Sequence, residues 1–292
     1  MYPESPGLLK PTYPTLKQSW GVLGWYLLLT LTVGVPVYFL LLNVLHAPKS
    51  ITGAALTVLT EVALFLLLLR KAGGLRQNPV QLTGQELPWL YMALPLLVLV
   101  QAVLLSSLLE FLHLPNIAEA SFRDLVKHPV LAFVVMCVAA PVLEELTFRG
   151  IILKGLLRNY HPWVAIGQSA LLFGLIHLNP LQIVGAGIIG LLVGWLYYRT
   201  QSLWLCIAAH ALNNFYAFLV MSTPTLSSVE TTQEIFPSTS MYLLAVVLSG
   251  CLLGLLLWRV KQVTTPIDAG SALTATRLTA DTAASVKEAP VA

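Results

Sequence analysis

Two carboxylates and a guanidinium interrupt a stretch of sequence that is otherwise apolar. Glu144, Glu145 and Arg149 lie in the run PVLEELTFRG, which begins at residue 141. Glu145 and Arg149 are four residues apart, so on a helix they share a face and are predicted to form an ion pair. Glu144 points about 100° away from them. It is therefore the carboxylate predicted to be free for proton transfer.

Two further motifs follow in apolar sequence. His177 ends the pattern Phe-x-x-x-His, and His210 and Asn214 form the pattern His-x-x-x-Asn. His210 and Asn214 share a helix face, so they can present hydrogen-bond donors toward one point. Peptide-bond hydrolysis needs an activated nucleophile and preorganised donors for the developing negative charge. The three motifs together contain both.

The predicted depth of these residues favours a common site. With a rise of about 1.5 Å per residue, Glu144 and His177 lie roughly 21 and 24 Å above a turn near residues 159–162. On the same basis, His210 and Asn214 lie roughly 12 and 18 Å above the start of their helix. All four can meet near mid-membrane, where ionisable residues are costly and usually functional.

Each of these motifs also has an explanation in which its residues serve packing and not chemistry. A Glu-Arg pair or a single histidine within a membrane helix can serve packing alone. Glu61 stands alone in another apolar stretch, and we expect it to have a packing or supporting role. Small residues are expected to let one helix pack closely against its neighbours: Gly185, Gly187, Gly190 and Gly194.

Composition identifies the elements that must position these residues. The chain has 292 residues, is 57% hydrophobic and 10% charged, and has a mean hydropathy of +0.79. These values predict an all-α, polytopic transmembrane bundle. About eight membrane helices are expected, at 20–45, 51–69, 88–112, 129–158, 161–178, 180–198, 202–221 and 241–258.

Charge and cysteine usage argue against a nucleic-acid-binding protein, a disulfide-stabilised protein and a thiolate zinc site. The net charge of +3 comes from basic residues at the ends of apolar stretches, so no nucleic-acid partner is indicated. The three cysteines lie in apolar stretches without CxxC spacing. They therefore predict neither a disulfide framework nor a thiolate zinc site.

The basic residues predict the orientation. If the N-terminus is cytoplasmic, thirteen of the sixteen Lys and Arg residues fall on the inside, and only Lys49, Arg123 and Lys127 fall outside. Lys and Arg favour the cytoplasmic side, so both termini are predicted to be cytoplasmic in a multi-pass protein, and we expect the plasma membrane. The expected divisions are a mobile segment 1–19, membrane helices 20–128, a catalytic membrane core 129–221, an external loop with the last helix 222–258, and a mobile tail 259–292.

The three motifs, Glu-Glu-x-x-x-Arg, Phe-x-x-x-His and His-x-x-x-Asn in this order, resemble the CPBP family of intramembrane proteases. That family includes CAAX prenyl endopeptidases of the Rce1 type and the bacterial Abi proteins, which act in bacteriocin processing and immunity. The resemblance covers roughly residues 129–221. It is most specific in the extended pattern EELTFRG.

The resemblance implies a role for each matching residue. Glu144 would activate a water that His177 also positions, with Glu145 and Arg149 in support, and His210 and Asn214 would stabilise the oxyanion. The family is often described as metalloproteases. We expect no cofactor, because Arg149 would repel a cation; the alternative is Zn²⁺ held by Glu144, His177 and His210.

The leading hypothesis is an intramembrane endopeptidase that acts on a membrane-associated or lipid-anchored polypeptide. The alternative is a non-catalytic immunity or scaffold protein of the same family, whose polar cluster binds a partner helix. A transporter ranks third, because the first half of the chain offers few pathway residues beyond Glu61 and Gln101.

Overall fold

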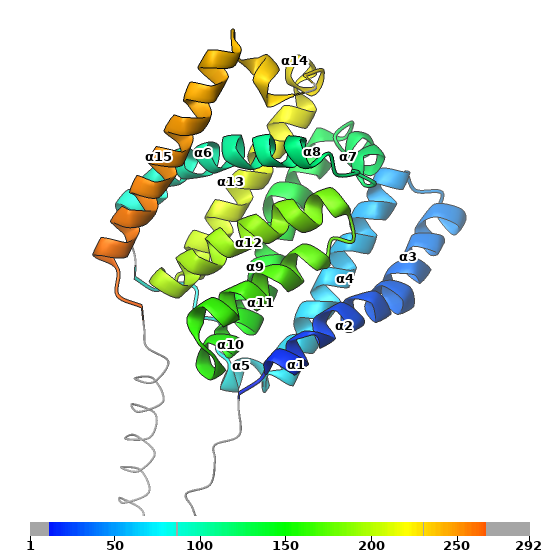
Figure 1. Ribbon diagram of the computed structural model, residues 1–292. Coiled ribbons are helices and arrows are strands. Elements are labelled where there is room, and N and C mark those ends of the chain that lie inside the picture. Colours follow the sequence, from blue (N-terminus) through cyan, green and yellow to red (C-terminus); the bar gives the residue numbers. More distant parts are fainter. Residues whose placement is uncertain (1–11, 86, 230, 267–292) are drawn as a thin grey trace, which may run out of the picture.

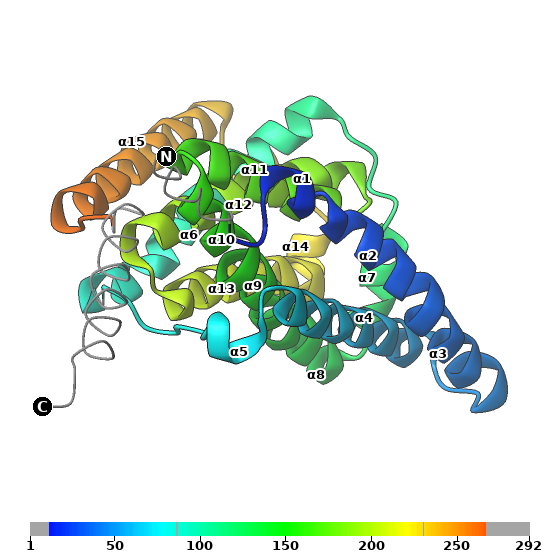
Figure 2. The same cartoon turned by 90° about the horizontal axis from the view of Figure 1, so that it is seen from below.

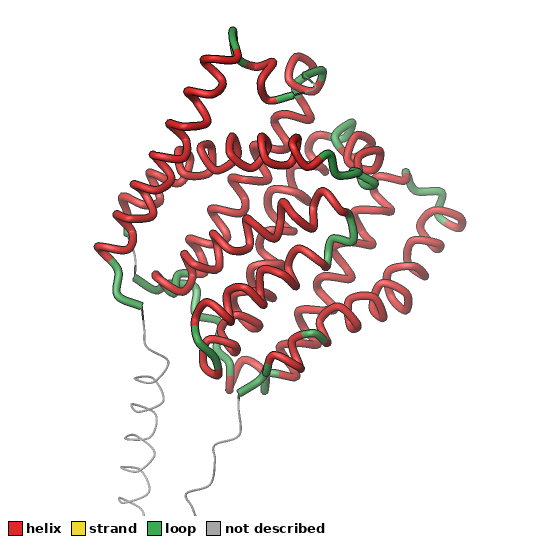
Figure 3. The backbone as a smooth tube through the Cα atoms, viewed as in Figure 1, coloured by secondary structure: helices red, strands yellow, loops and turns green. Residues whose placement is uncertain are grey.

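A computed structural model describes residues 12–85, 87–229 and 231–266. Within these ranges every regular element is a helix, as Figure 3 shows, so the predicted all-α class is confirmed. The chain is a multi-pass membrane protein, since seven helices are long and apolar enough to cross a bilayer. These span Leu16–Val44, Lys49–Lys71, Pro88–Leu112, Pro129–Asn159, Pro180–Thr200, Leu203–Ser222 and Thr239–Val263.

Among the described residues, seven of the eight expected membrane helices are long and apolar enough to cross a bilayer. The apolar stretch 161–178 forms only a 14-residue helix, α11 (Pro162–Leu175). At about 1.5 Å per residue it rises roughly 21 Å, which is less than the hydrocarbon thickness of about 30 Å. Leu178 then adopts a left-handed φ of 54°, and Pro180 begins the next helix. The chain therefore turns immediately after His177, between α11 and α12.

Two of the long spans are built from consecutive helical segments. The first contains α1 (Leu16–Ser19), α2 (Gly21–Leu29), η1 (Thr30–Gly34), α3 (Val35–Phe39) and η2 (Leu40–Val44). The fourth contains α8 (Pro129–Ala132), η3 (Phe133–Ala139), α9 (Ala140–Thr147), η4 (Phe148–Leu153) and α10 (Lys154–Asn159). The remaining spans are α4 (Lys49–Lys71), α6 (Pro88–Leu112), α12 (Pro180–Thr200), α13 (Leu203–Ser222) and α15 (Thr239–Val263). The short connecting helices are α5 (Gly74–Gln77), α7 (Glu119–Leu125), α14 (Pro224–Ser227) and η5 (Thr232–Ile235).

Four helices form the centre of the bundle. Figure 1 shows α9, α11, α12 and α13 between α4 and the first span on one side and α6 with α15 on the other. Seen from below, in Figure 2, α9 and α13 lie between α4 and α12. The main apolar core draws most of its buried side chains from η4, α11, α12 and α13, with further contributions from α4 and α6. The elements that carry the three motifs therefore lie against one another at the centre.

Glycines allow the close contact between α11 and α12. A Cβ added at Gly174 would lie 2.4 Å from the backbone oxygen of Ile183, and one added at Gly190 would lie 3.1 Å from the Cα of Ala170. Neither position has room for a side chain unless the backbone moves. The expected role of small residues in helix packing is confirmed at Gly190, and Gly174 contributes from the facing helix.

The described ends of the chain contact the bundle. Asn159 Oδ1 accepts a hydrogen bond from the backbone N–H of Thr12 at 3.1 Å, and Ser19 is buried. Arg199 hydrogen-bonds to Thr264, next to the end of α15. The rest of the two segments expected to be mobile, residues 1–11 and 267–292, lies outside the described residues. So do Lys10, Arg277 and Lys287, which counted toward the predicted orientation.

Candidate active site

The helical span that carries the two glutamates changes its geometry on both sides of them. α9 holds Glu144 and Glu145, and it lies between the π-helical segments η3 and η4. Pro141 has no amide hydrogen and cannot continue the ordinary i→i−4 pattern, which is one physical reason for the change of winding here. π-helical turns within α-helices occur frequently at functional sites. The π-helical turns on both sides of α9 therefore favour a functional role for the segment that carries Glu144 and Glu145.

Glu145 lies at the centre of a buried polar cluster. Its Oε1 accepts a hydrogen bond from Arg149 Nη1 at 2.7 Å, so the predicted ion pair is confirmed. The same oxygen lies 2.8 Å from His210 Nδ1. The Glu145 and Arg149 side chains are 0% and 1% exposed. Glu145 thus links α9 to η4 through Arg149 and to α13 through His210.

The contact with Glu145 defines the orientation of His210. An ionised carboxylate can only accept, so Nδ1 carries the proton of this hydrogen bond. The other ring nitrogen, Nε2, then points to Glu144 and lies 3.9 Å from its Oε2. This is too long for a direct hydrogen bond. Glu144 Oε2 has no hydrogen-bond partner within the described part of the chain.

Phe173 packs against three of the predicted site residues. Its ring lies 4.6 Å from the Arg149 guanidinium carbon. Its centroid is 5.4 Å from the His177 ring and 5.6 Å from the His210 ring, both edge-to-face. Stacking on an aromatic face stabilises a guanidinium. Arg149 Nη2 also donates to the carbonyl oxygen of Gly190, at 3.2 Å.

His177 is held by its own helix. Its Nδ1 lies 2.9 Å from the carbonyl oxygen of Phe173. A carbonyl only accepts, so Nδ1 carries a proton here too, and Nε2 takes no part in this hydrogen bond. The residue sits beyond the last turn of α11 and is partly exposed. The short helix and the turn after it therefore determine the position of this imidazole.

Asn214 connects α13 to η3. Its Nδ2 donates to the carbonyl oxygen of Met136 at 2.9 Å, and its Oδ1 accepts from Asn213 Nδ2 at 3.3 Å. The amide group has a second hydrogen on Nδ2, which remains for another acceptor. Within the described residues, no hydrogen bond or ion pair joins Asn214 or His177 to Glu144. The contacts thus join Glu144, Glu145, Arg149 and His210, while His177 is linked to them through Phe173.

The donor atoms do not form a zinc site in this arrangement. A zinc ion at the alternative site would need three donors, from Glu144, His177 and His210, at about 2.0–2.2 Å. Among the described residues, no group of three His, Cys, Asp or Glu side chains converges closely enough to hold a metal ion. We therefore derive no step through a metal.

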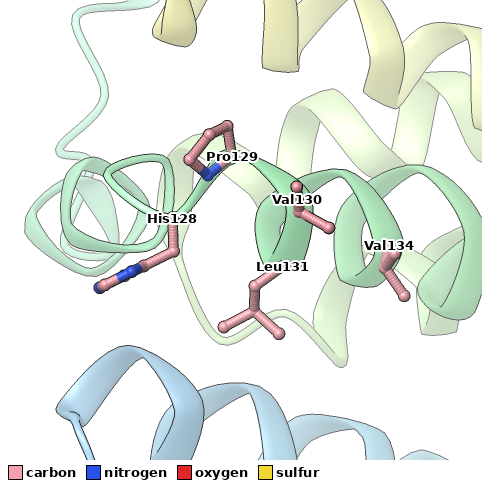
Figure 4. A pocket seen from close by; sticks show the side chains of 5 residues that line it. All are labelled: His128, Pro129, Val130, Leu131 and Val134. Carbon is pink, nitrogen blue, oxygen red and sulfur yellow. The ribbon is translucent and has the colours of Figure 1, made fainter.

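A surface hollow lies on the same span but away from these residues. Figure 4 shows it around the start of the span, where it is lined by His128, Pro129, Val130, Leu131 and Val134. Val134 is ten residues before Glu144, which corresponds to roughly 15 Å along a helix. This hollow does not belong to the candidate active site.

Two features of the site were not identified from the sequence. Phe173 was part of a motif, but its contact with Arg149 and both imidazoles had not been expected. The carbonyl of Gly190 acts as an acceptor for Arg149, and a backbone group has no signature in residue type. The Gly pattern indicated only that the two helices would approach closely.

Comparisons with known proteins identify the segment that carries the motifs. Residues 126–216 match the family model described as type II CAAX prenyl endopeptidase Rce1-like. The chain is also similar to the protein named "Putative membrane peptidase YdiL" of Bacillus subtilis (strain 168), with 27% identity over 107 residues. That alignment spans 37% of this chain and 44% of the relative, less than half of either protein. No solved structure matches the chain. The match contains all three motifs, so it confirms that the segment 126–216 resembles the Rce1-like CAAX prenyl endopeptidases of the CPBP family.

Proposed function

We propose that this protein is an intramembrane endopeptidase in which a water activated by Glu144 hydrolyses a peptide bond. The observation that carries the proposal is the 3.9 Å separation between His210 Nε2 and Glu144 Oε2. Two polar atoms that face each other beyond direct hydrogen-bond distance can be bridged by an oxygen about 2.8 Å from each. A water molecule fits this description, because it can donate to Glu144 while its oxygen accepts from His210. The buried pair of Glu145 and Arg149 keeps the imidazole in place.

In the proposed reaction these residues act one after another. Glu144 accepts a proton from the water as the water oxygen attacks the carbonyl carbon of the scissile bond. His210 and Asn214 donate hydrogen bonds to the resulting oxyanion. The C–N bond then breaks, and Glu144 returns its proton to the leaving nitrogen. His177 would help to orient the attacking water.

Glu145 supports the part played by His210 in this scheme. With Nδ1 donating to Glu145, His210 can donate from Nε2 only as an imidazolium. The negative charge of Glu145 stabilises that positive charge, in the way that a buried carboxylate supports the histidine of a serine protease. Arg149 balances Glu145 on the other side. The three residues together supply a charged hydrogen-bond donor inside an apolar bundle.

We propose a membrane-associated or lipid-anchored polypeptide as the substrate, entering from the cytoplasmic side. The matched family is described by its action on CAAX prenyl proteins. A bundle with an active site at bilayer depth suits substrates that already lie in the membrane. The proposed orientation has both described ends on the cytoplasmic side, and α1 and the end of α15 lie toward the same end of the bundle in Figure 1.

The test is a proteomic comparison of membranes that carry wild-type protein or Glu144→Gln. The amide keeps the size of the side chain and cannot accept the proton, so we expect an uncleaved substrate to accumulate. Glu119→Gln is the matched control, because Glu119 is exposed on α7, where it pairs with Arg123. Identical peptide profiles for wild type and Glu144→Gln would favour the alternative, a non-catalytic immunity or scaffold protein.

A further inference from the structure

Glu61 faces the candidate active site from a different helix. It lies in the middle of α4, which packs against α9 and α2. Its carboxylate interacts electrostatically with that of Glu144, and the Tyr26 hydroxyl of α2 interacts with both. Sequence alone had suggested a packing or supporting role for Glu61. The packing of α4 on α9 brings it near Glu144, the proposed catalytic carboxylate.

Among the described residues, the Glu61 carboxyl group has no counter-ion. Its Oε2 is shielded from solvent and has no hydrogen-bond partner in the same part of the chain. Within the described part of the chain, the buried guanidinium of Arg149 is committed to Glu145 and Gly190. Lys71, on the same helix, lies over the Trp25 ring at 4.7 Å and is ten residues away, or roughly 15 Å along α4.

The polar cluster as a whole is short of positive charge. Glu145 is balanced by Arg149, and Glu144 faces the His210 imidazolium of the proposed mechanism, which leaves Glu61 as the carboxyl group without a cation among the described residues. Like charges repel strongly in a low-dielectric interior, and an unpaired carboxylate at bilayer depth is costly. Ionisable residues inside a membrane bundle usually pair with another group and mark functional sites.

We propose that Glu61 determines specificity by pairing with a lysine or arginine side chain of the substrate. This inference rests on the proposed endopeptidase function. An extended chain advances about 3.3–3.6 Å per residue, so a side chain that reaches Glu61 while the scissile bond lies at Glu144 comes from within about three positions of that bond. The preferred substrate is therefore a membrane-associated polypeptide with a basic residue next to the cleavage site.

The experiment uses purified full-length protein in detergent micelles and a library of synthetic apolar peptides. The peptides carry Lys, Arg, Gln or Leu at randomised positions, and new termini are identified by mass spectrometry. Wild-type products should contain Lys or Arg within three positions of the cut, with kcat/KM about tenfold or more above matched Gln peptides. Glu61→Gln should bring the ratio of basic to neutral peptides to about one, and Glu61→Asp should retain a preference for basic peptides. Size-exclusion profiles establish that each variant is folded.

Each outcome bears on the proposal. Equal use of basic and neutral peptides by the wild type would overturn it. A uniform loss across all peptides in Glu61→Gln, with the preference intact in the remaining activity, would assign Glu61 a structural role instead. Products that persist in Glu144→Gln would contradict the proposed catalytic function while leaving the specificity pattern of Glu61 measurable. A folded wild-type protein that cleaves no peptide would refute both, and Glu119→Gln controls for substitution of an acidic residue outside the bundle core.

Discussion

His210 Nδ1 lies 2.8 Å from Glu145 Oε1, and this same oxygen accepts a hydrogen bond from Arg149. One buried carboxylate oxygen thus serves a cation and an imidazole, and it connects α9, η4 and α13. Loss of the carboxylate would affect both partners, although in different ways. Stability depends on the balance of charge with Arg149, whereas activity depends on the orientation of His210.

Glu145→Gln should therefore lower both stability and activity. Removal of one partner of a buried ion pair costs about 3–5 kcal/mol because the other charge is left uncompensated. The double variant Glu145→Gln with Arg149→Gln should recover part of the free energy of unfolding, since no unpaired charge remains. Its activity should stay low, because His210 still lacks an anionic partner. Denaturant titration in detergent and a cleavage assay measure the two effects, and recovery of full activity in the double variant would contradict the role of Glu145.

The oxyanion donors predict a loss of rate with intact binding. His210→Ala and Asn214→Ala should each lower kcat by roughly 10²–10³, the usual scale for removal of one oxyanion donor. KM should change little, because the charge develops only in the transition state. Asn43→Ala is the control, since Asn43 is exposed and donates only to its own helix at Phe39. A rise in KM at constant kcat would assign the two residues to ground-state binding.

Metal content separates two mechanisms. If Glu144 activates water unaided, purified protein should contain no stoichiometric zinc, and chelators should leave cleavage unchanged. Zinc in a one-to-one ratio that is lost in both His177→Ala and His210→Ala would establish the metal mechanism. Asn214→Ala should keep any such zinc, because a side-chain amide is not a usual zinc ligand. Elemental analysis of these variants decides the question.

Packing between α11 and α12 predicts opposite effects for two glycines of the same helix. Gly174→Ala should destabilise the protein by about 1–3 kcal/mol, because the new Cβ would meet backbone that cannot easily move. It should also lower activity, since His177 lies three residues away. Gly167→Ala has nothing within 4 Å of the added Cβ and should be neutral or slightly stabilising through helix propensity. Thermal unfolding of the two variants would show the difference, and equal effects would contradict the close approach of the helices.

The orientation can be measured by labelling. A single cysteine at Ser227, placed in a variant that lacks the native cysteines, should react with a membrane-impermeant reagent from outside the cell. Ser227 lies in α14, between the last two membrane spans. Labelling from the cytoplasmic side alone would reverse the predicted topology. Arg149 is buried in the bundle, so it does not count as a loop charge. The predicted distribution of Lys and Arg then becomes twelve on the inside and three on the outside.

Local patterns in the sequence were sufficient for the features that depend on one helix. Apolar runs of about 20 residues identify membrane helices because each must satisfy its own backbone in lipid. Four-residue spacing predicted the pair of Glu145 and Arg149, since neighbours on one face meet whatever the rest of the fold does. Length was the weak point for α11, because apolar composition does not reveal where a helix stops within the bilayer.

Contacts between helices were decided by tertiary structure. The sequence placed His210 at a depth compatible with Glu144, but it could not show that Nδ1 would bind Glu145 and leave Nε2 facing Glu144. Likewise, Glu61 has no partner within its own helix, and only the packing of α4 against α9 brings it to the site. Such pairings depend on the rotation and tilt of each helix about its neighbours. Those angles are set by the summed packing of many side chains, such as the close approach at Gly174 and Gly190, and residue spacing along one helix does not encode them.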